Sequence, residues 1–136
     1  MRKLSVSCFW LLVSCTGLYS QNYSGDSWAH VKAKGEGTIS LAYVDSPGLV
    51  YKDNGGNLTG ICVDIMSDFT KFVNQKKGVK LSTKFVGNGT SFKAMYDNVK
   101  TSKEGVIGLG SVTITEERKK EIPLPTNLVL SFTPFF

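Results

Sequence analysis

Apolar residues recur at two different spacings along the chain, and the two spacings alternate. An alternation of period two, typical of strands, runs through residues 38–44 and 79–86, and a short apolar run covers residues 106–109. Between these runs, apolar residues recur at helical spacing over residues 62–74 and 91–101. Strands that alternate with helices predict an α/β fold with an open, mostly parallel sheet flanked by helices.

Three further segments complete the predicted order of elements. Residues 21–37 are polar and contain glycine, and we interpret them as a lead-in to the domain. The turn sequence of residues 53–57 separates two short apolar runs and predicts a hairpin. Thr115, a good N-cap residue, begins a short helix that we expect to end near Glu121, before Pro123.

The loops that follow the three main strands carry the polar side chains of interest. In an open parallel sheet the carboxyl ends of the strands share one edge, and ligands bind beyond that edge. Asp45 follows the first strand, residues 87–90 follow the second, and residues 110–115 follow the third. We therefore expect these three loops to converge on one site.

The segment from residue 110 to residue 118 has the features of an anion-binding site. Ser111 and Thr113 offer hydroxyl groups, and the turn offers backbone N–H groups at a strand-to-helix junction. Arg118 lies one helical turn further on, and its planar guanidinium can hold a carboxylate with two hydrogen bonds. The pattern by itself indicates a carboxylate or phosphate ligand.

Charge and motifs argue against several classes of function. The formal net charge of the 136 residues is +5, but the lysines are scattered, which is typical of a solvated surface and not of a nucleic-acid interface. Gly108 and Gly110 do not begin a dinucleotide fingerprint, because Thr113 occupies the position of the third glycine. His30, the only histidine, has no triad or metal partner nearby in the sequence. With no base–nucleophile pair apparent, we predict a binding protein rather than an enzyme, with no cofactor or metal.

Residues 1–20 have the pattern of a secretory signal, in which two basic residues precede an apolar stretch too short to span a membrane. Two alternatives remain for where this segment is cleaved. A lipobox would make Cys15 the lipidated N-terminus, whereas cleavage after Ser20 would release a soluble protein, and the interrupted apolar stretch favours release. Of the three cysteines, Cys62 alone lies beyond this segment. We therefore expect no internal disulfide and no cysteine metal site, and interpret Cys62 as a small buried hydrophobic residue.

Three stretches of the chain match motifs of a known family. Residues 110–122 (GSVTITEERKKEI) follow a strand-turn-helix pattern, and residues 55–65 (GGNLTGICVDI) place a glycine before an acidic-apolar helix start. Residues 132–135 (FTPF) look like a Phe-Ser-x-Pro-aromatic motif. In these stretches the chain resembles the bacterial extracellular solute-binding proteins of family 3, the amino-acid-binding receptors of ABC importers. The resemblance covers roughly residues 38–136.

The resemblance implies a ligand and the residues that bind it. Arg118 would bind the α-carboxylate of an amino acid, and Thr113 would add its hydroxyl and backbone N–H to the same group. Ser111 and the backbone at Gly110 would contact the carboxylate or the α-amino group. Asp45 would recognise the side chain of the ligand. The protein would be a monomeric periplasmic component that serves the membrane permease of an ABC transporter.

The resemblance also implies an incomplete binding protein. Family members have two lobes that close on the ligand like a clamshell, and residues 38–136 resemble the first lobe only. We therefore interpret the chain as a fragment, a truncated clamshell whose second lobe is absent. Such a chain would hold at most half of a site, and the loss of closure would lower its affinity.

Departures from the family pattern leave the ligand and the role open. Cys62 stands in place of the usual first acidic residue, Gly105 stands where an aspartate is common, and residues 123–130 form an insertion. The aromatic residue that stacks on the ligand is not placed, although Phe92 lies nearby. One alternative is the ligand-sensing domain of a receptor, a kinase or a glutamate-receptor-like protein. A less favoured alternative is a periplasmic enzyme on the same fold.

Overall fold

The computed structural model describes residues 23–113 and 115–121. The signal segment with Cys15, the insertion at residues 123–130 and the motif at residues 132–135 lie outside the described residues. The elements follow one another in the order α1 (Trp28–Lys34), β1 (Glu36–Val44), β2 (Tyr51–Lys52), β3 (Leu58–Thr59), α2 (Ile61–Lys77), β4 (Lys80–Gly89), α3 (Phe92–Thr101), β5 (Val106–Leu109) and α4 (Glu116–Glu121).

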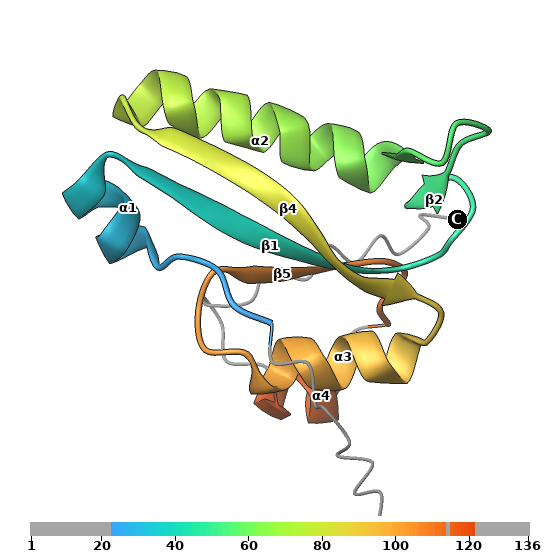
Figure 1. The fold of residues 1–136 in the computed structure, drawn as a ribbon. Coiled ribbons are helices and arrows are strands. Elements are labelled where there is room, and N and C mark those ends of the chain that lie inside the picture. The colour runs from blue at the N-terminus through green and yellow to red at the C-terminus, as the bar shows by residue number, and fades with distance from the viewer. Residues whose placement is uncertain (1–22, 114, 122–136) are drawn as a thin grey trace, which may run out of the picture.

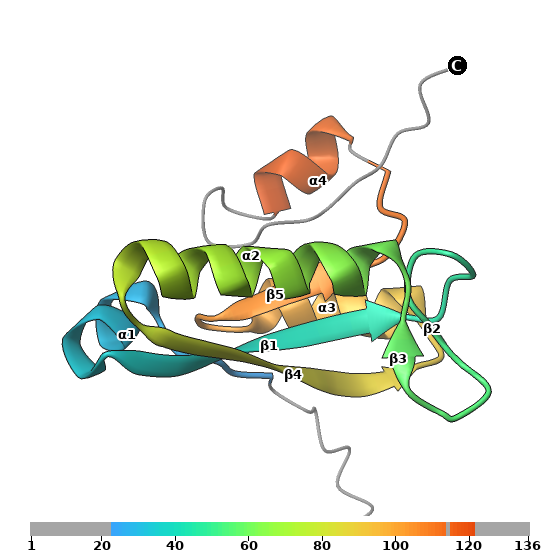
Figure 2. The ribbon, with the colours of Figure 1, turned by 90° about the horizontal axis from the view of Figure 1, so that it is seen from above.

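The main sheet consists of three parallel strands in the order β4-β1-β5 (Figure 2). The register aligns Val44 of β1 with Gly89 of β4, and Tyr43 of β1 with Leu109 of β5. Parallel neighbours need crossover connections, which α2 and α3 provide here. The structure thus confirms the open parallel α/β sheet that the sequence predicts.

Helices α2 and α3 cover opposite faces of the sheet (Figure 1). The period-two alternation of β1 supplies both faces with apolar side chains. Leu41 and Tyr43 pack in one cluster with Met66 of α2, whereas Ala42 packs in another with Met95 of α3. All five residues are less than a tenth exposed. The core therefore has two layers, with the central strand between them.

Helix α2 begins and ends beside glycines. Gly60 precedes it, and Gly78 follows it in the left-handed region, with a φ of 63°, where its N–H donates to the carbonyl of Asn74. A glycine suits this position because it adopts positive φ without steric cost. Gly78 is thus the C-cap, and the helix extends beyond the predicted residues 62–74 to Ile61–Lys77.

The short strands β2 and β3 form the predicted hairpin around residues 53–57. The carboxylate of Asp53 accepts hydrogen bonds from the backbone N–H groups of Gly55 and Asn57, each at 2.8 Å. These bonds, first the one from Asn57, favour the charged form and lower the pKa of Asp53. The turn is thus held by its own side chain, and it leads the chain into α2.

The segment interpreted as a lead-in contains a helix that the sequence analysis did not predict. The side chain of Ser27 accepts a hydrogen bond from the backbone N–H of His30 and caps α1. Val31, 1% exposed, packs in one cluster with Val73 and Leu81. Residues 23–37 therefore include part of the packed domain, and β1 begins at Glu36 rather than at residue 38.

Candidate functional site

The structure brings the loops after β1, β4 and β5 to one edge of the sheet. Asp45 follows Val44 at the end of β1, and its backbone N–H donates to the carbonyl of Gly89 at 2.8 Å. On the other side of β1, Leu109 pairs with Tyr43, so Gly110 begins its loop beside the same strand end. This edge is where a parallel sheet offers a ligand site.

Close packing limits position 110 to a glycine. A Cβ atom there would lie 2.7 Å from Cγ1 of Val44, well inside van der Waals contact. Gly110 is buried, whereas Ser111 and Thr113 on either side of the buried Val112 are exposed. The turn is therefore anchored by Val112 and presents both hydroxyl-bearing residues to solvent.

Helix α4 begins as the sequence predicts. The hydroxyl of Thr115 accepts a hydrogen bond from the backbone N–H of Arg118 at 3.2 Å, which is the geometry of an N-cap. Glu116 and Glu117 occupy the first turn, where the helix dipole favours acidic residues. The cap sets the direction in which the helix leaves the turn and so places Arg118.

Arg118 lies against the turn and against helix α3. Its Nη1 donates to the carbonyl of Thr113 at 2.8 Å. Its guanidinium carbon lies 5.3 Å from the ring centroid of Phe92 and 5.5 Å from that of Tyr96. These two rings are themselves stacked, with centroids 5.9 Å apart. Since a guanidinium is attracted to the face of an aromatic ring, the two contacts restrict its orientation.

The predicted site residues are thus brought together to different degrees. Arg118 contacts Thr113 directly, and Gly110 and Ser111 belong to the same turn. Asp45 is exposed at the end of the neighbouring strand, and among the described residues its side chain forms no hydrogen bond or ion pair. The acid and the arginine are therefore not a structural salt bridge within this part of the chain.

The pair of rings under Arg118 is a feature that the sequence analysis did not assign to the site. Of the apolar residues at helical spacing on α3, Met95 and Val99 are buried. Phe92 and Tyr96 are only half-buried. In the sequence, the feature that could have indicated this contact is a pair of aromatic residues four positions apart on the predicted helix before the arginine.

The described residues give no indication of a metal centre or a reactive thiol. They contain no group of three or more histidine, cysteine or acidic residues that could hold a metal ion. Cys62 is fully buried beside Leu41 and Met66, as predicted, and burial raises the pKa of its thiol. None of the helices in residues 23–113 and 115–121 is both long and apolar enough to cross a membrane.

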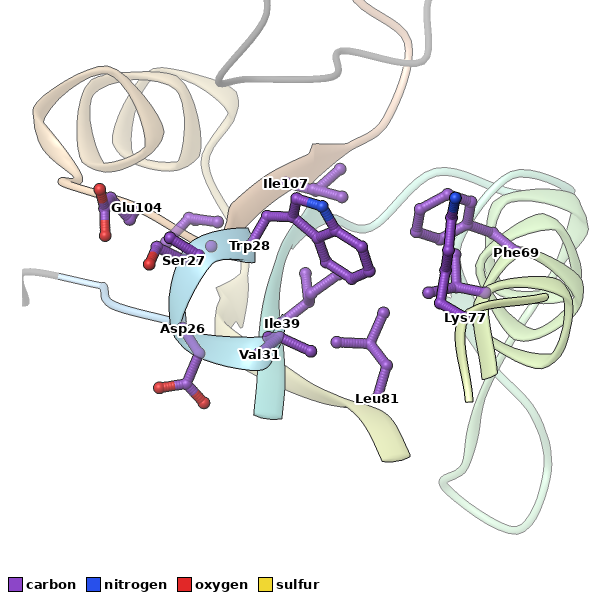
Figure 3. A pocket seen from close by; sticks show the side chains of 14 residues that line it. Asp26, Ser27, Trp28, Val31, Ile39, Phe69, Lys77, Leu81, Glu104 and Ile107 are labelled. Carbon is purple, nitrogen blue, oxygen red and sulfur yellow. The ribbon is translucent and has the colours of Figure 1, made fainter. Parts of the chain in front are cut away.

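A separate cavity of about 550 Å³ lies near the amino ends of the strands. Trp28 of α1 and Phe69 of α2 stand on opposite sides of it, with Ile39 and Leu81 between them (Figure 3). Its lining is mostly apolar and includes Lys77 but no arginine. The cavity is therefore distinct from the Arg118 turn, which lies at the opposite ends of the strands.

No protein-family model and no curated protein matches the chain. Solved structures do match part of it. The holo form of ArgBP from T. maritima is 30% identical over 68% of this chain and 36% of that chain, with a TM-score of 0.46. An ancestral cationic amino acid solute-binding protein is 27% identical over 68% of this chain and 36% of that chain, with a TM-score of 0.44.

A further match is the arginine-bound form of domain 1 of the same ArgBP, 27% identical over 66% of this chain and 64% of that domain, with a TM-score of 0.42. The chain thus spans about a third of the length of the two larger proteins. The names of these proteins describe a solute-binding protein for cationic amino acids and a protein domain with bound arginine.

Proposed function

We propose that the protein is an extracytoplasmic receptor that binds an amino acid reversibly, and that the described residues carry the first half of its site. One observation carries the proposal. At the carboxyl edge of the sheet, Nη1 of Arg118 lies 2.8 Å from the carbonyl of Thr113, in the turn that also contains the exposed Ser111. A fixed cation on a turn that also carries two exposed hydroxyl residues is suited to a carboxylate.

The chemistry of Arg118 supports a carboxylate ligand. A guanidinium has five N–H donors, and among the described residues Arg118 uses one Nη1 bond to a protein acceptor. The remaining donors would bind the two oxygens of an α-carboxylate. Thr113 would add its hydroxyl and backbone N–H, and Ser111 and the Gly110 backbone would bind the carboxylate or the α-amino group.

Asp45 supports recognition of the other end of the ligand. It follows the central strand, is exposed, and lies in a loop that begins beside the end of β4. An acidic side chain in that position would pair with a cationic or hydroxyl group of the ligand side chain. A ligand held between Arg118 and Asp45 would extend along the edge of the sheet.

The proposal includes a role in transport. The motif resemblance and the signal-like residues 1–20 support a monomeric periplasmic component that delivers its ligand to the permease of an ABC importer. Binding would be non-covalent and would involve no catalytic step. Because these residues supply one side of the ligand, the affinity of this half-site should be modest, since closure of a second lobe would exclude water from the contacts.

Calorimetric titration with a panel of L-amino acids tests the proposal. One or more amino acids should bind, and Arg118→Ala should weaken that binding by about 2–5 kcal/mol, the usual cost of removing one partner of a charged hydrogen-bonded pair. Arg118→Lys should recover part of the loss, because a lysine keeps the charge but cannot form two parallel bonds.

Lys119→Ala is the matched control for the arginine variants. Lys119 is on the same short helix and carries the same charge, but its ammonium pairs with Glu116 at 2.7 Å and is half exposed. Its replacement should leave the affinity within about twofold of the wild type, as for most exposed ion pairs. An unchanged affinity in Arg118→Ala would remove Arg118 from the site.

A further inference from the structure

Helix α4 carries Arg118, and within its described residues it buries no apolar side chain. It spans six residues, Glu116–Glu121, and none of them is buried. Isolated helices of this length are unstable in water, and most helices in proteins are stabilised by an apolar face. Other contacts must therefore hold this helix, and with it the arginine, in place.

The contacts that hold α4 come from one stripe of α3. The hydroxyl of Tyr96 donates to Oε2 of Glu121 at 3.0 Å. Nζ of Lys100 lies 3.3 Å from Oε1 of the same carboxylate. One turn earlier on α4, the guanidinium of Arg118 lies over the rings of Phe92 and Tyr96. In Figure 1, α4 lies behind and below α3.

Both helices contribute regularly spaced residues to this contact. Phe92, Tyr96 and Lys100 are four residues apart and so share one face of α3. Arg118 and Glu121 are three residues apart and share one face of α4. Tyr96 is the common element, because its ring contacts Arg118 and its hydroxyl contacts Glu121.

We propose that Tyr96, Lys100 and Glu121 are positioning residues that hold the guanidinium of Arg118 at the ligand edge. The effect of this positioning on ligand affinity rests on the proposed function, whereas the positioning of Arg118 does not depend on it. A long arginine side chain loses considerable rotamer freedom when it binds a ligand. Contacts that restrict it in advance reduce that loss and so increase affinity.

The charges around Glu121 are consistent with this role. The hydrogen bond from Tyr96, followed by the contacts with Lys100, lowers the pKa of the Glu121 carboxyl, although Asp97 nearby acts in the opposite direction. Glu121 is therefore ionised at neutral pH. It accepts from Tyr96 and Lys100 as a carboxylate, and Arg118 on the same helix face remains available to the rings and to a ligand.

Three variants of the full chain separate the parts of this arrangement. Tyr96→Phe removes the hydroxyl and keeps the ring, Tyr96→Leu removes both, and Glu121→Gln removes the charge. Lys119→Ala is the control, because Lys119 lies next to Arg118 on α4 but pairs with Glu116 and not with Glu121. The readouts are the NMR signals of the Arg118 side chain, the midpoint of thermal unfolding and the affinity for the amino acid that binds best.

The ring currents of Phe92 and Tyr96 should shift the Arg118 signals upfield in the wild type. Tyr96→Leu should remove the part of that shift that comes from the Tyr96 ring, about half, and weaken binding about tenfold, whereas Tyr96→Phe should keep much of the shift and weaken binding about fivefold, the effect of one hydrogen bond. Glu121→Gln should behave like Tyr96→Phe, and Lys119→Ala like the wild type. The thermal midpoints should stay close together, since α4 buries no residue.

The proposal is overturned if Tyr96→Leu and Glu121→Gln leave both the Arg118 signals and the affinity as in the wild type. It is also overturned if the variants lose affinity only in proportion to a loss of global stability, because the role would then be structural. If the wild type binds no amino acid, the proposed function fails. The Arg118 signals still decide the positioning in that case.

Discussion

Replacing Gly110 by alanine tests whether close packing at the end of β5 shapes the candidate site. The added Cβ would lie 2.7 Å from Cγ1 of Val44, roughly 0.8–1.3 Å inside the optimal separation of two carbon atoms. Valine is stiff about χ1, so the strain would be relieved by moving β5 away from β1. Overpacking of this kind costs about 1–3 kcal/mol, and the turn with Ser111 and Thr113 would move with the strand.

Gly108→Ala, two residues earlier and within β5, is the control for an added methyl group at a position without a positive φ. Its Cβ would lie 3.1 Å from Sδ of Met95, a flexible side chain that can move aside. The expected cost is below about 1 kcal/mol, because a small adjustment restores normal contact. Urea unfolding of the two variants and the wild type gives the differences in the free energy of unfolding. The midpoints are compared with one shared value for the dependence of that free energy on urea concentration. Amino-acid titration of folded Gly110→Ala should show a loss of about tenfold or more, because a displaced binding group loses much of its effect.

Two results would refute the steric reasoning. The first is a Gly110→Ala variant that unfolds at the same urea concentration as the wild type. The second is a Gly108→Ala variant that loses more stability than Gly110→Ala. In either case the contact between Val44 and position 110 would not control the spacing of β1 and β5.

Two further predictions concern α1 and the contact between α3 and α4. Val31→Ala removes two buried methyl groups from the contact with α2 and should destabilise the domain by about 1.5–3 kcal/mol in urea unfolding, whereas Lys32→Ala on the exposed side of α1 should have little effect. The pKa of Glu121 is lowered in the folded state, first by the hydrogen bond from Tyr96, so its contribution to stability is present above the ordinary glutamate pKa and is lost as the pH falls through the folded value. An NMR titration should therefore place this pKa below the ordinary glutamate range and show a rise in Tyr96→Phe; an unchanged pKa in that variant would contradict the assigned hydrogen bond.

Local patterns predicted the elements whose stability depends on neighbours along the chain. The helical spacing of apolar residues 62–74 marked helix α2, and Gly78 ends it because a C-cap needs a residue that adopts positive φ. Thr115 marked the start of α4 for a similar reason, since its hydroxyl accepts from a backbone N–H three residues later. The convergence of the loops after β1, β4 and β5 followed from the general rule for parallel sheets.

Helix α1 was missed because its signal is weak at the level of sequence. It has seven residues, of which Val31 alone is buried, so no amphipathic stripe marks it. Its position depends on apolar side chains from α2 and β4 that lie some 40 to 50 residues further along the chain, such as Val73 and Leu81. A pattern within a short stretch of sequence cannot predict a contact between residues so far apart in the chain.

For the candidate site, the sequence by itself determined which residues could bind an anion and at which edge of the sheet they lie. Only the tertiary structure decided how Arg118 is held, because its contacts with Phe92 and Tyr96 join two helices that are separated by β5 and a turn. Periodicity describes the faces of each helix but not which face meets another helix. Packing of α4 against α3 converts a flexible arginine in a short polar helix into a group with a defined position beside Thr113.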